Sequence, residues 1–429
     1  MLDIKLLREE PEKVKKGIAA KRADPKLVDT FLRLDAEWRE LVKAVDEKRA
    51  EQKRLSESRD INAARKNKEE IKAAEEKLGD LEKMREEVLL QIPNLPSEDT
   101  PVGKSEEDNK VIRKWGEPRK FSAKGGFKPK DHLELGEALG IIDVESAGKV
   151  SGTRFAYLKG DAVLLEFALA QYAFEVLGNQ EIIRSIAEGV RPGWSPKTFL
   201  PVIPPTMVRP DVLQRMGRLE PKEERYYIPS DDIYLVGSSE HTLGPLHMDE
   251  VIPEDKLPIR YVGFSTSYRR EAGSYGKDTR GILRVHQFDK VEMESFTLPE
   301  DSVAEQDFFV AIQEYLMKSL EIPYRVAVIC TGDMGGPDAR QIDIEAWMPG
   351  QNQYRETHTA DLMTDYQSRR LNTRVRRKGG KTELVHMVDG TVFAIGRTLI
   401  AIMENYQTED GKIEVPRVLQ KYVNKKVIG

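Results

Sequence analysis

Apolar residues in the first hundred positions recur at alternating spacings of four and three. This heptad spacing predicts two amphipathic helices, with Arg85 at one position where an apolar residue is expected. The polar residues 57–68 separate the two series, so we predict an antiparallel helical hairpin over about 27–92, preceded by a short helix over 1–22. The first series is Leu27, Phe31, Leu34, Trp38, Leu41 and Val45, and the second is Ile71, Ala74, Leu78, Leu81, Val88 and Ile92.

The pattern changes after the prolines at 93, 96 and 101, which end the hairpin and stiffen the chain. We therefore place one domain at 1–100 and a second at 101–429. The second mixes predicted helices at 161–178 and 300–320 with predicted strands at 324–330, 341–347 and 370–376. Because these elements do not alternate as regular β-α-β units, they indicate an α+β fold on an antiparallel sheet.

Composition narrows the class of protein. The 429 residues are 39% hydrophobic and 33% charged, and no stretch is apolar for the length of a membrane span. The charged N-terminus lacks the apolar segment of a signal peptide. A single cysteine, Cys330, excludes an internal disulfide framework, and the spacing of His241 and His247 does not suit a helical metal site, so we expect no zinc. These features predict a cytoplasmic protein. A net charge of -5 means that any nucleic acid contact must be local.

The segment from about 264 to 292 carries the first candidate chemistry. Its pattern predicts a strand, a glycine-bearing loop with Lys277 and Arg280, and a second strand. An arginine at a strand end offers a planar fork for phosphate, an aromatic ring can stack on a base, and a glutamate can hold an ammonium group. The same pattern also suits an ordinary charged β-hairpin. The run that stands out is Arg284-Val285-His286-Gln287-Phe288-Asp289-Lys290-Val291-Glu292, preceded by Tyr268-Arg269-Arg270-Glu271.

A second candidate segment, 390–405, predicts a strand that turns into a helix at Gly396-Arg397. An arginine at this junction lies where the helix N-terminal amides already favour anions. A capped core helix with a solvated arginine is the alternative.

Together these segments resemble motifs 2 and 3 of class II aminoacyl-tRNA synthetases, and with the preceding helical hairpin they are most similar to the seryl-tRNA synthetase family. The resemblance covers nearly the whole chain. It implies a catalytic domain on an antiparallel β-sheet flanked by helices, preceded by a coiled-coil arm. It also implies that serine is activated with ATP and Mg²⁺ and transferred to its tRNA, with selenocysteine tRNA as a further candidate acceptor. Residues 161–208, which include Pro204-Pro205-Thr206-Met207-Val208, resemble motif 1, which implies a homodimer. The alternative is a simple edge strand, since edge strands tolerate proline.

The resemblance assigns roles to individual residues. Arg269 binds the α-phosphate and the serine carboxylate, Glu271 the adenine edge, and Phe288 and Arg397 enclose the adenine ring. Glu356 helps to hold Mg²⁺ and the phosphates, and Arg269 and Arg397 are the catalytic pair. The remaining residues implied to bind ATP are Arg270, Val285, Thr357, His358 and Thr359, and those implied to bind serine are Ser238, Ser239, Glu240, Glu292 and Thr391.

Three positions depart from the family pattern. Ser238 stands where threonine is frequent, Arg270 replaces a small residue, and Thr357-His358-Thr359 replaces Ile-Ser-Ser. None of the three removes a charge that the chemistry needs.

The arm is the expected tRNA-binding element. Its tip is locally basic, with Arg59, Arg65, Lys66 and Lys68 against Asp60. A dimerisation coiled coil is the alternative for the heptads. A cluster of arginines between 369 and 377 is a second basic surface that suits tRNA or simple solvation. Two other functions compete with this one. The first is an enzyme that activates serine but loads a carrier protein, and the presence of the long arm argues against it. The second is a non-catalytic RNA-binding protein, and the presence of Arg269, Glu292 and Arg397 argues against it.

Overall fold

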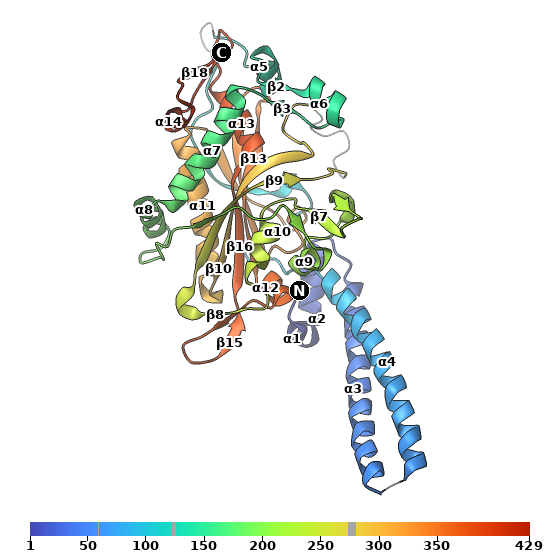
Figure 1. The fold of residues 1–429 in the computed structure, drawn as a ribbon. Helices are drawn as coiled ribbons and strands as arrows, with labels where there is room; N and C mark the ends of the chain where they lie inside the picture. The colour runs from blue at the N-terminus through green and yellow to red at the C-terminus, as the bar shows by residue number, and fades with distance from the viewer. Residues whose placement is uncertain (59, 122–125, 273–279) are drawn as a thin grey trace. The chain divides into compact units, whose positions relative to one another are not determined.

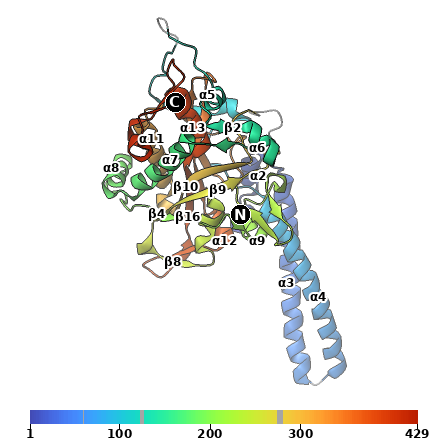
Figure 2. The ribbon, with the colours of Figure 1, turned by 45° about the horizontal axis from the view of Figure 1, so that its top comes forward.

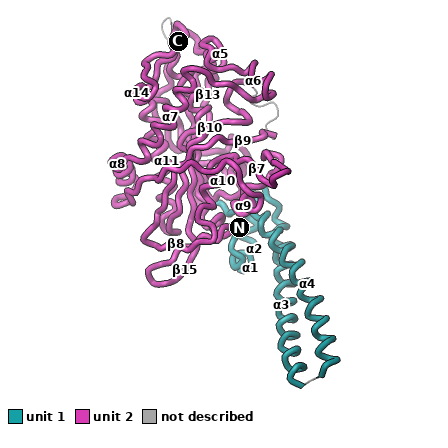
Figure 3. The backbone as a smooth tube through the Cα atoms, in the orientation of Figure 1, with its two compact units in different colours: residues 1–96 teal, residues 97–429 magenta. Residues whose placement is uncertain are grey.

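The computed structural model describes residues 1–58, 60–121, 126–272 and 280–429. The chain forms two compact units, Met1–Pro96 and Ser97–Gly429 (Figure 3). Within the described residues, none of the helices combines the length and apolarity needed to cross a membrane.

The first unit is helical, as the heptad spacing predicts. Its helices are α1 (Ile4–Glu9), α2 (Pro11–Ala20), α3 (Lys26–Ser58) and α4 (Ile61–Gln91). The prediction of a single helix over 1–22 is wrong, because Pro11 lacks an amide hydrogen and starts a new helix instead of continuing α1. The polar residues 57–68 are also mostly helical. Asp60 caps α4 by accepting from the Ala63 amide at 3.0 Å.

The charged residue in the heptad series belongs to a buried ionic cluster in this unit. Arg85 donates to the fully buried Asp35 at 2.8 Å, and Arg8 binds the same carboxylate through two hydrogen bonds of 2.8 Å. The Arg85 guanidinium also lies 4.7 Å from the Trp38 ring centre. Arginine therefore replaces an apolar side chain here because it satisfies a buried acid and still packs on an aromatic ring.

The second unit is built on an eight-stranded sheet in the order β1-β11-β12-β13-β16-β10-β9-β4. Figures 1 and 2 show its neighbouring strands β9, β10 and β16. Neighbouring strands are antiparallel except for β4 and β9, which are parallel. This confirms the predicted α+β fold with an antiparallel sheet. The strands are β1 (Lys110–Trp115), β4 (Leu200–Val202), β9 (Ile259–Tyr268), β10 (Gln287–Thr297), β11 (Tyr324–Val328), β12 (Arg340–Met348), β13 (Gln353–Thr364) and β16 (His386–Ala394).

Helices pack against this sheet and enclose the main core. The predicted helices at 161–178 and 300–320 are α7 (Asp161–Gly178) and α11 (Ser302–Ser319). α11 lies along β13 and β16, where a Cβ on Gly390 would be 3.0 Å from the Phe309 ring. Because Gly390 and Thr391 point to opposite faces of β16, α11 covers the face opposite to Thr391.

One predicted strand is wrong in part. Residues 370–376 begin as the end of α12 (Tyr366–Leu371) and become a strand only at β14 (Arg374–Arg376), after Asn372 in the left-handed conformation. The other helices are α5 (His132–Ala138), α6 (Val144–Ser151), α8 (Gln180–Val190), α9 (Pro210–Met216), α10 (Glu240–Leu243), α13 (Ile395–Asn405) and α14 (Gln420–Val423). The small sheets contain β2 (Ile142–Asp143), β3 (Tyr157–Leu158), β5 (Met207–Val208), β6 (Tyr227–Ile228), β7 (Ile233–Leu235), β8 (Val251–Pro253), β15 (Thr382–Leu384), β17 (Ile413–Glu414) and β18 (Val427–Ile428).

Candidate active site

A cavity of about 370 Å³ opens on the central strands of the large sheet. Strands β9, β10, β16 and β13 are neighbours, so residues that are far apart in sequence line one face. Glu292 lies opposite Thr391 in the ladder, and Ala360 lies opposite Gly390. Of the residues predicted for the site, the cavity is lined by Glu240, Arg269, Glu271, Val285, Phe288, Glu356, Thr359, Thr391 and Arg397.

Two β-bulges bring these side chains to the same face. On β13, Glu345 pairs with Glu356 and the next partner, Ile344, pairs with His358, so Thr357 is an extra residue. The extra residue lets Glu356 and Thr359 both face the cavity, although regular alternation would put them on opposite faces. The second bulge is on β16, where Val392 is the extra residue between Thr391 and Phe393.

Two arginines line the cavity. Arg269 follows the last residue of β9, and its Nε donates to the Gly237 carbonyl at 3.1 Å. Arg397, in the first turn of α13, pairs with Glu356 at 3.0 Å. Partial loss of solvent in the cavity would by itself raise the pKa of Glu356, but Arg397 and Arg269 outweigh this effect and lower that pKa. The pair therefore keeps an ionised carboxylate beside two cations.

Another part of the cavity wall is formed by the region around β10. The Arg269 guanidinium carbon lies 5.4 Å from the Phe288 ring centre. Glu271, in a left-handed conformation with φ 53°, binds Arg284 at 2.8 Å. Val285 is buried in the cavity wall. A planar heterocycle can stack on Phe288 while its polar edge meets Glu271.

Three residues predicted for ATP binding point elsewhere in the structure. The Arg270 guanidinium lies over the Tyr226 ring, 5.8 Å from its centre. The Thr357 hydroxyl donates to the Ile344 carbonyl at 3.2 Å, and His358 packs edge-on against Phe393. Burial lowers the pKa of His358 to about 3, so its ring is neutral. Thr357 and His358 therefore support the bulge instead of lining the cavity.

Three acidic side chains meet at Glu240, which is one of the residues that line the cavity. Oxygens of Glu240, Glu292 and Asp389 lie within 4.8 Å of one another, and all three residues are buried. Lys290 pairs with Glu292 at 2.6 Å and also contacts the Ser238 hydroxyl at 3.4 Å. Burial raises the pKa of Glu292 and holds that of Asp389 well above its usual range. Such a cluster favours a cation that can take several hydrogen bonds, such as an ammonium group.

Arg218 is the principal functional residue that sequence reasoning missed. It lies just after α9, and its guanidinium contacts Glu240 at 2.8 Å, Asp389 at 3.4 Å and Asp338 at 3.5 Å. Burial opposes its charge, but these carboxylates outweigh burial and raise its pKa well above its usual value. Arg218 and His241 likewise outweigh the burial of Glu240 and lower the pKa of that carboxyl.

Lys290 and Asp389 were also missed, and both had a signal in the sequence. Lys290 is two residues before Glu292, and a strand places such residues on one face. Asp389 is two residues before Thr391. Arg218 had no comparable signal because it comes from a loop.

We expect Arg218→Gln to destabilise the second unit by about 3 kcal/mol, because it leaves buried carboxylates without their cation. The loss should shrink as pH falls, since the affected carboxylates can then take up protons. Thermal unfolding of the full chain at pH 8 and pH 5.5 measures both effects. Arg209→Gln is the matched control, because Arg209 forms an exposed pair with Asp211 and should cost less than about 1 kcal/mol. An equal loss in the two variants would contradict this role.

The predicted tRNA-binding residues lie in the first unit. Arg65 and Lys66 are exposed near the start of α4 and pair loosely with Glu69 at 3.7 Å and Glu70 at 4.0 Å. Lys68 is also exposed. Arg59 lies outside the described residues.

The arginines between 369 and 377 have mostly protein partners. Arg370 is buried and donates to the Gln214 carbonyl and the Tyr366 hydroxyl, while Arg377 binds Glu300. Arg374 and Arg376 are exposed on β14. The cluster is therefore mainly structural.

Both units match models of known protein families. Residues 1–96 match the seryl-tRNA synthetase N-terminal domain, and residues 225–406 match the class II tRNA synthetase core domain of the G, H, P, S and T enzymes. The chain is 44% identical to a serine–tRNA ligase of Acidothermus cellulolyticus, with 100% of this chain and 99% of the relative aligned. It is 41% identical to that of Dictyoglomus turgidum, with 99% and 98% aligned.

Solved structures agree over the full length. Seryl-tRNA synthetase from Pyrococcus horikoshii, complexed with ATP, has a TM-score of 0.90 and 38% identity and covers 100% of this chain and 99% of its own. The cytoplasmic serine–tRNA ligase of Naegleria fowleri, in complex with AMP, has a TM-score of 0.88 and 34% identity, with 100% and 98% covered. The chain therefore belongs to the seryl-tRNA synthetase family of class II aminoacyl-tRNA ligases.

Proposed function

We propose that the cavity joins serine to AMP, using ATP and Mg²⁺, and that the seryl group then passes to the terminal ribose of the serine tRNA. The observation that carries this proposal is that Arg269, Arg397 and Glu240 line one cavity, and that oxygens of two further buried carboxylates, Glu292 and Asp389, lie within 4.8 Å of Glu240. An amino acid has one carboxylate and one ammonium group, and ATP adds phosphates. The cavity offers a partner of opposite charge to each of them.

Arg269 and Arg397 are the residues that hold the anions. The Arg269 fork binds the serine carboxylate and the α-phosphate, and its Nε contact with Gly237 fixes the plane of the fork. The serine carboxylate oxygen attacks the α-phosphorus, the bond to the β-phosphate oxygen breaks, and pyrophosphate leaves. The chain supplies alignment and charge for this step and no side-chain nucleophile.

Mg²⁺ fits the donors on this wall of the cavity. Proteins usually bind Mg²⁺ through one or two carboxylates together with phosphate oxygens and water. Glu356 offers such a carboxylate, and its side chain is 49% exposed. When bound with ATP, the ion neutralises phosphate charge. Arg397 keeps the Glu356 carboxylate ionised for that contact.

The acidic end of the cavity binds the serine side of the reaction. Glu240, Glu292 and Asp389 surround the ammonium group, and Thr391 and the nearby serines supply hydroxyl partners for the substrate hydroxyl. Alanine would leave buried polar atoms without partners, and this penalty disfavours it.

Serine-dependent exchange of pyrophosphate into ATP tests the first step, and charging of bulk tRNA tests the second. We expect exchange with serine that falls strongly with alanine. A protein that exchanges with serine but charges no tRNA would support the carrier-loading alternative. A protein without serine-dependent exchange would contradict the proposal.

We expect the KM for serine to rise as pH falls. The rise should begin at a pH above 4.5, which is the ordinary pKa of a glutamate. Burial raises the pKa of Glu292, and protonation removes the charge that attracts the ammonium group. Exchange assays from pH 5 to pH 8 measure this dependence, with the KM for ATP as the internal reference. Glu292→Gln should raise the serine KM by about 10- to 100-fold and flatten its pH dependence. An unchanged pH profile in that variant would contradict the assignment.

A homodimer in the cytoplasm completes the proposal. Apolar side chains are exposed together along α7 and the β4 region, within the segment that resembles motif 1. They are Leu164 (44% exposed), Phe167 (60%), Leu200 (60%) and Ile203 (87%). Apolar surface of this kind supports an interface between two copies of the chain.

A further inference from the structure

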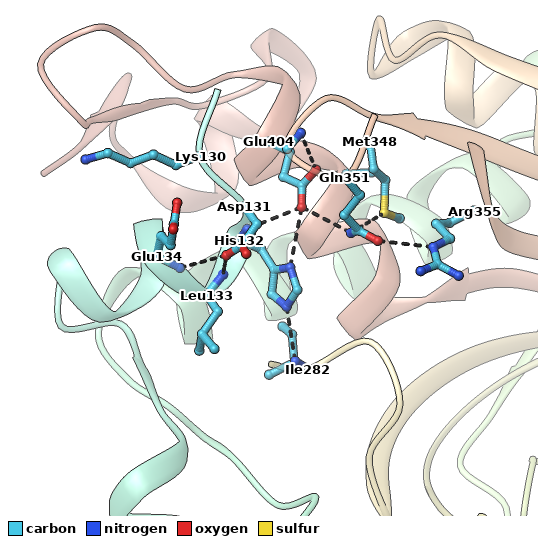
Figure 4. A network of polar contacts seen from close by, with 12 residues as sticks. Lys130, Asp131, His132, Leu133, Glu134, Ile282, Met348, Gln351, Arg355 and Glu404 are labelled. Carbon is cyan, nitrogen blue, oxygen red and sulfur yellow. Dashed lines mark hydrogen bonds and ion pairs between the residues drawn. The ribbon is translucent and has the colours of Figure 1, made fainter. Parts of the chain in front are cut away.

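His132 connects two elements of the site and has no role in the chemistry described above. It is the first residue of α5, where Asp131 caps the helix, and its side chain is buried (Figure 4). The Nε2 atom accepts a hydrogen bond from the Ile282 amide at 3.2 Å. On the other side of the ring, Nδ1 lies 3.4 Å from Glu404 Oε1.

These contacts determine the state of the ring. Because Nε2 accepts from a backbone amide, it carries no proton, so a neutral ring has its proton on Nδ1, directed at Glu404. Glu404 in turn accepts from the His132 amide at 3.2 Å, the Gln351 side chain at 3.1 Å and the Gly350 amide at 2.9 Å (Figure 4). The imidazole is therefore held from behind by a carboxylate with several fixed partners.

The held segment, residues 282–285, is part of the cavity wall. Its Arg284 binds Glu271, the residue at the adenine edge. The approach of the imidazole is close, since a Cβ on Gly281 would lie 2.0 Å from His132 Nε2, and Gly281 has φ 73°. Glycine is needed there for both reasons.

The other end of the connection is the helix that carries Arg397. Glu404 is seven residues after Arg397 on α13, which is about two helical turns. His132 thus ties the segment beside the adenine edge to the helix that holds the phosphate-binding arginine. Gly396 adds a direct contact, because a Cβ there would lie 3.4 Å from the Ile282 carbonyl oxygen.

We propose that His132 is a positioning residue for ATP: through Ile282 and Glu404 it sets the distance between the adenine wall and the first turn of α13. This inference rests on the proposed function, because it takes the cavity as the ATP site. It assigns His132 to nucleotide affinity and not to recognition of serine, whose partners lie at the other end of the cavity.

The test is His132→Phe, which keeps an aromatic ring but can neither accept from Ile282 nor donate to Glu404. We expect its KM for ATP and its Kd for ATP, measured by calorimetry without serine, to rise about tenfold, with the serine KM at saturating ATP within twofold of the parent. A merely structural role would lower the active fraction, and hence kcat, without moving the KM for ATP. His132→Gln, which restores an acceptor and a donor, should recover part of the ATP affinity.

Two further variants keep the test decisive. Tyr324→Phe is the matched control, because it removes one buried hydrogen bond, to Glu314 at 2.8 Å, on a strand away from the cavity, and should leave the KM for ATP unchanged. If His132→Phe does not fold, Gly281→Ala provides a second test. Its added methyl group would displace residues 282–285 from the His132 imidazole, and we expect the Kd for ATP to rise to a similar extent. Unchanged ATP binding in the folded variants would overturn the inference. A parent that binds ATP but shows no serine-dependent exchange would instead overturn the proposed function alone.

Discussion

Replacing Arg269 with lysine will slow adenylate formation by about 30- to 1000-fold, a rise in barrier of about 2–4 kcal/mol. The reason is geometric. Arg269 uses Nε to hold the Gly237 carbonyl at 3.1 Å. We propose that its terminal nitrogens bind the serine carboxylate and the α-phosphate. Lysine keeps the charge but has one nitrogen, so it cannot be anchored and bridge two anions in one plane.

Pyrophosphate exchange at saturating serine and ATP measures this effect. Arg209→Lys is the control, since it makes the same change in an exposed ion pair with Asp211 and should leave exchange unchanged. Exchange in Arg269→Lys at the parent rate would remove Arg269 from the phosphate-binding role.

The helical unit could be predicted from sequence because its pattern is local. Heptad spacing depends on residues three and four apart, and it correctly indicated α3 and α4. The spacing could not explain Arg85, because its partner Asp35 lies fifty residues away and pairs only when the hairpin closes. The break between α1 and α2 has a local cause in Pro11, which starts a helix and cannot continue one.

Only part of the cavity could be predicted from the sequence, because some of its residues are placed by contacts between distant parts of the chain. Residues within the recognised segments, such as Arg269, Phe288 and Arg397, do line it. The faces of β13 could not be read from alternation, because the bulge at Thr357 shifts every later side chain by one position. Arg218 depends on three carboxylates that come from separate parts of the chain, so only the folded unit identifies it as their shared cation.

Removing residues 42–78 will abolish tRNA charging while leaving serine-dependent exchange within about twofold of the parent. The deletion joins Leu41 to Gly79 through a short glycine-rich linker. It keeps the Asp35–Arg85 and Asp35–Arg8 pairs, so the base of the arm retains its buried ionic cluster. We expect kcat/KM for tRNA to fall at least about a hundredfold, because the phosphate contacts that we expect the arm to make would be lost together.

A second variant tests the charges of the tip within the intact arm. Arg65→Glu, Lys66→Glu and Lys68→Glu in one chain should weaken charging strongly and reduce its dependence on salt, since fewer counterions are then released. The matched control reverses three exposed lysines of the shaft, Lys43, Lys77 and Lys83, which should change charging much less. Sedimentation of the deletion variant decides the competing use of the heptads. If the shortened chain is monomeric where the parent is dimeric, the arm is a dimerisation coiled coil, and if it still charges tRNA at the parent rate, the arm does not bind tRNA productively.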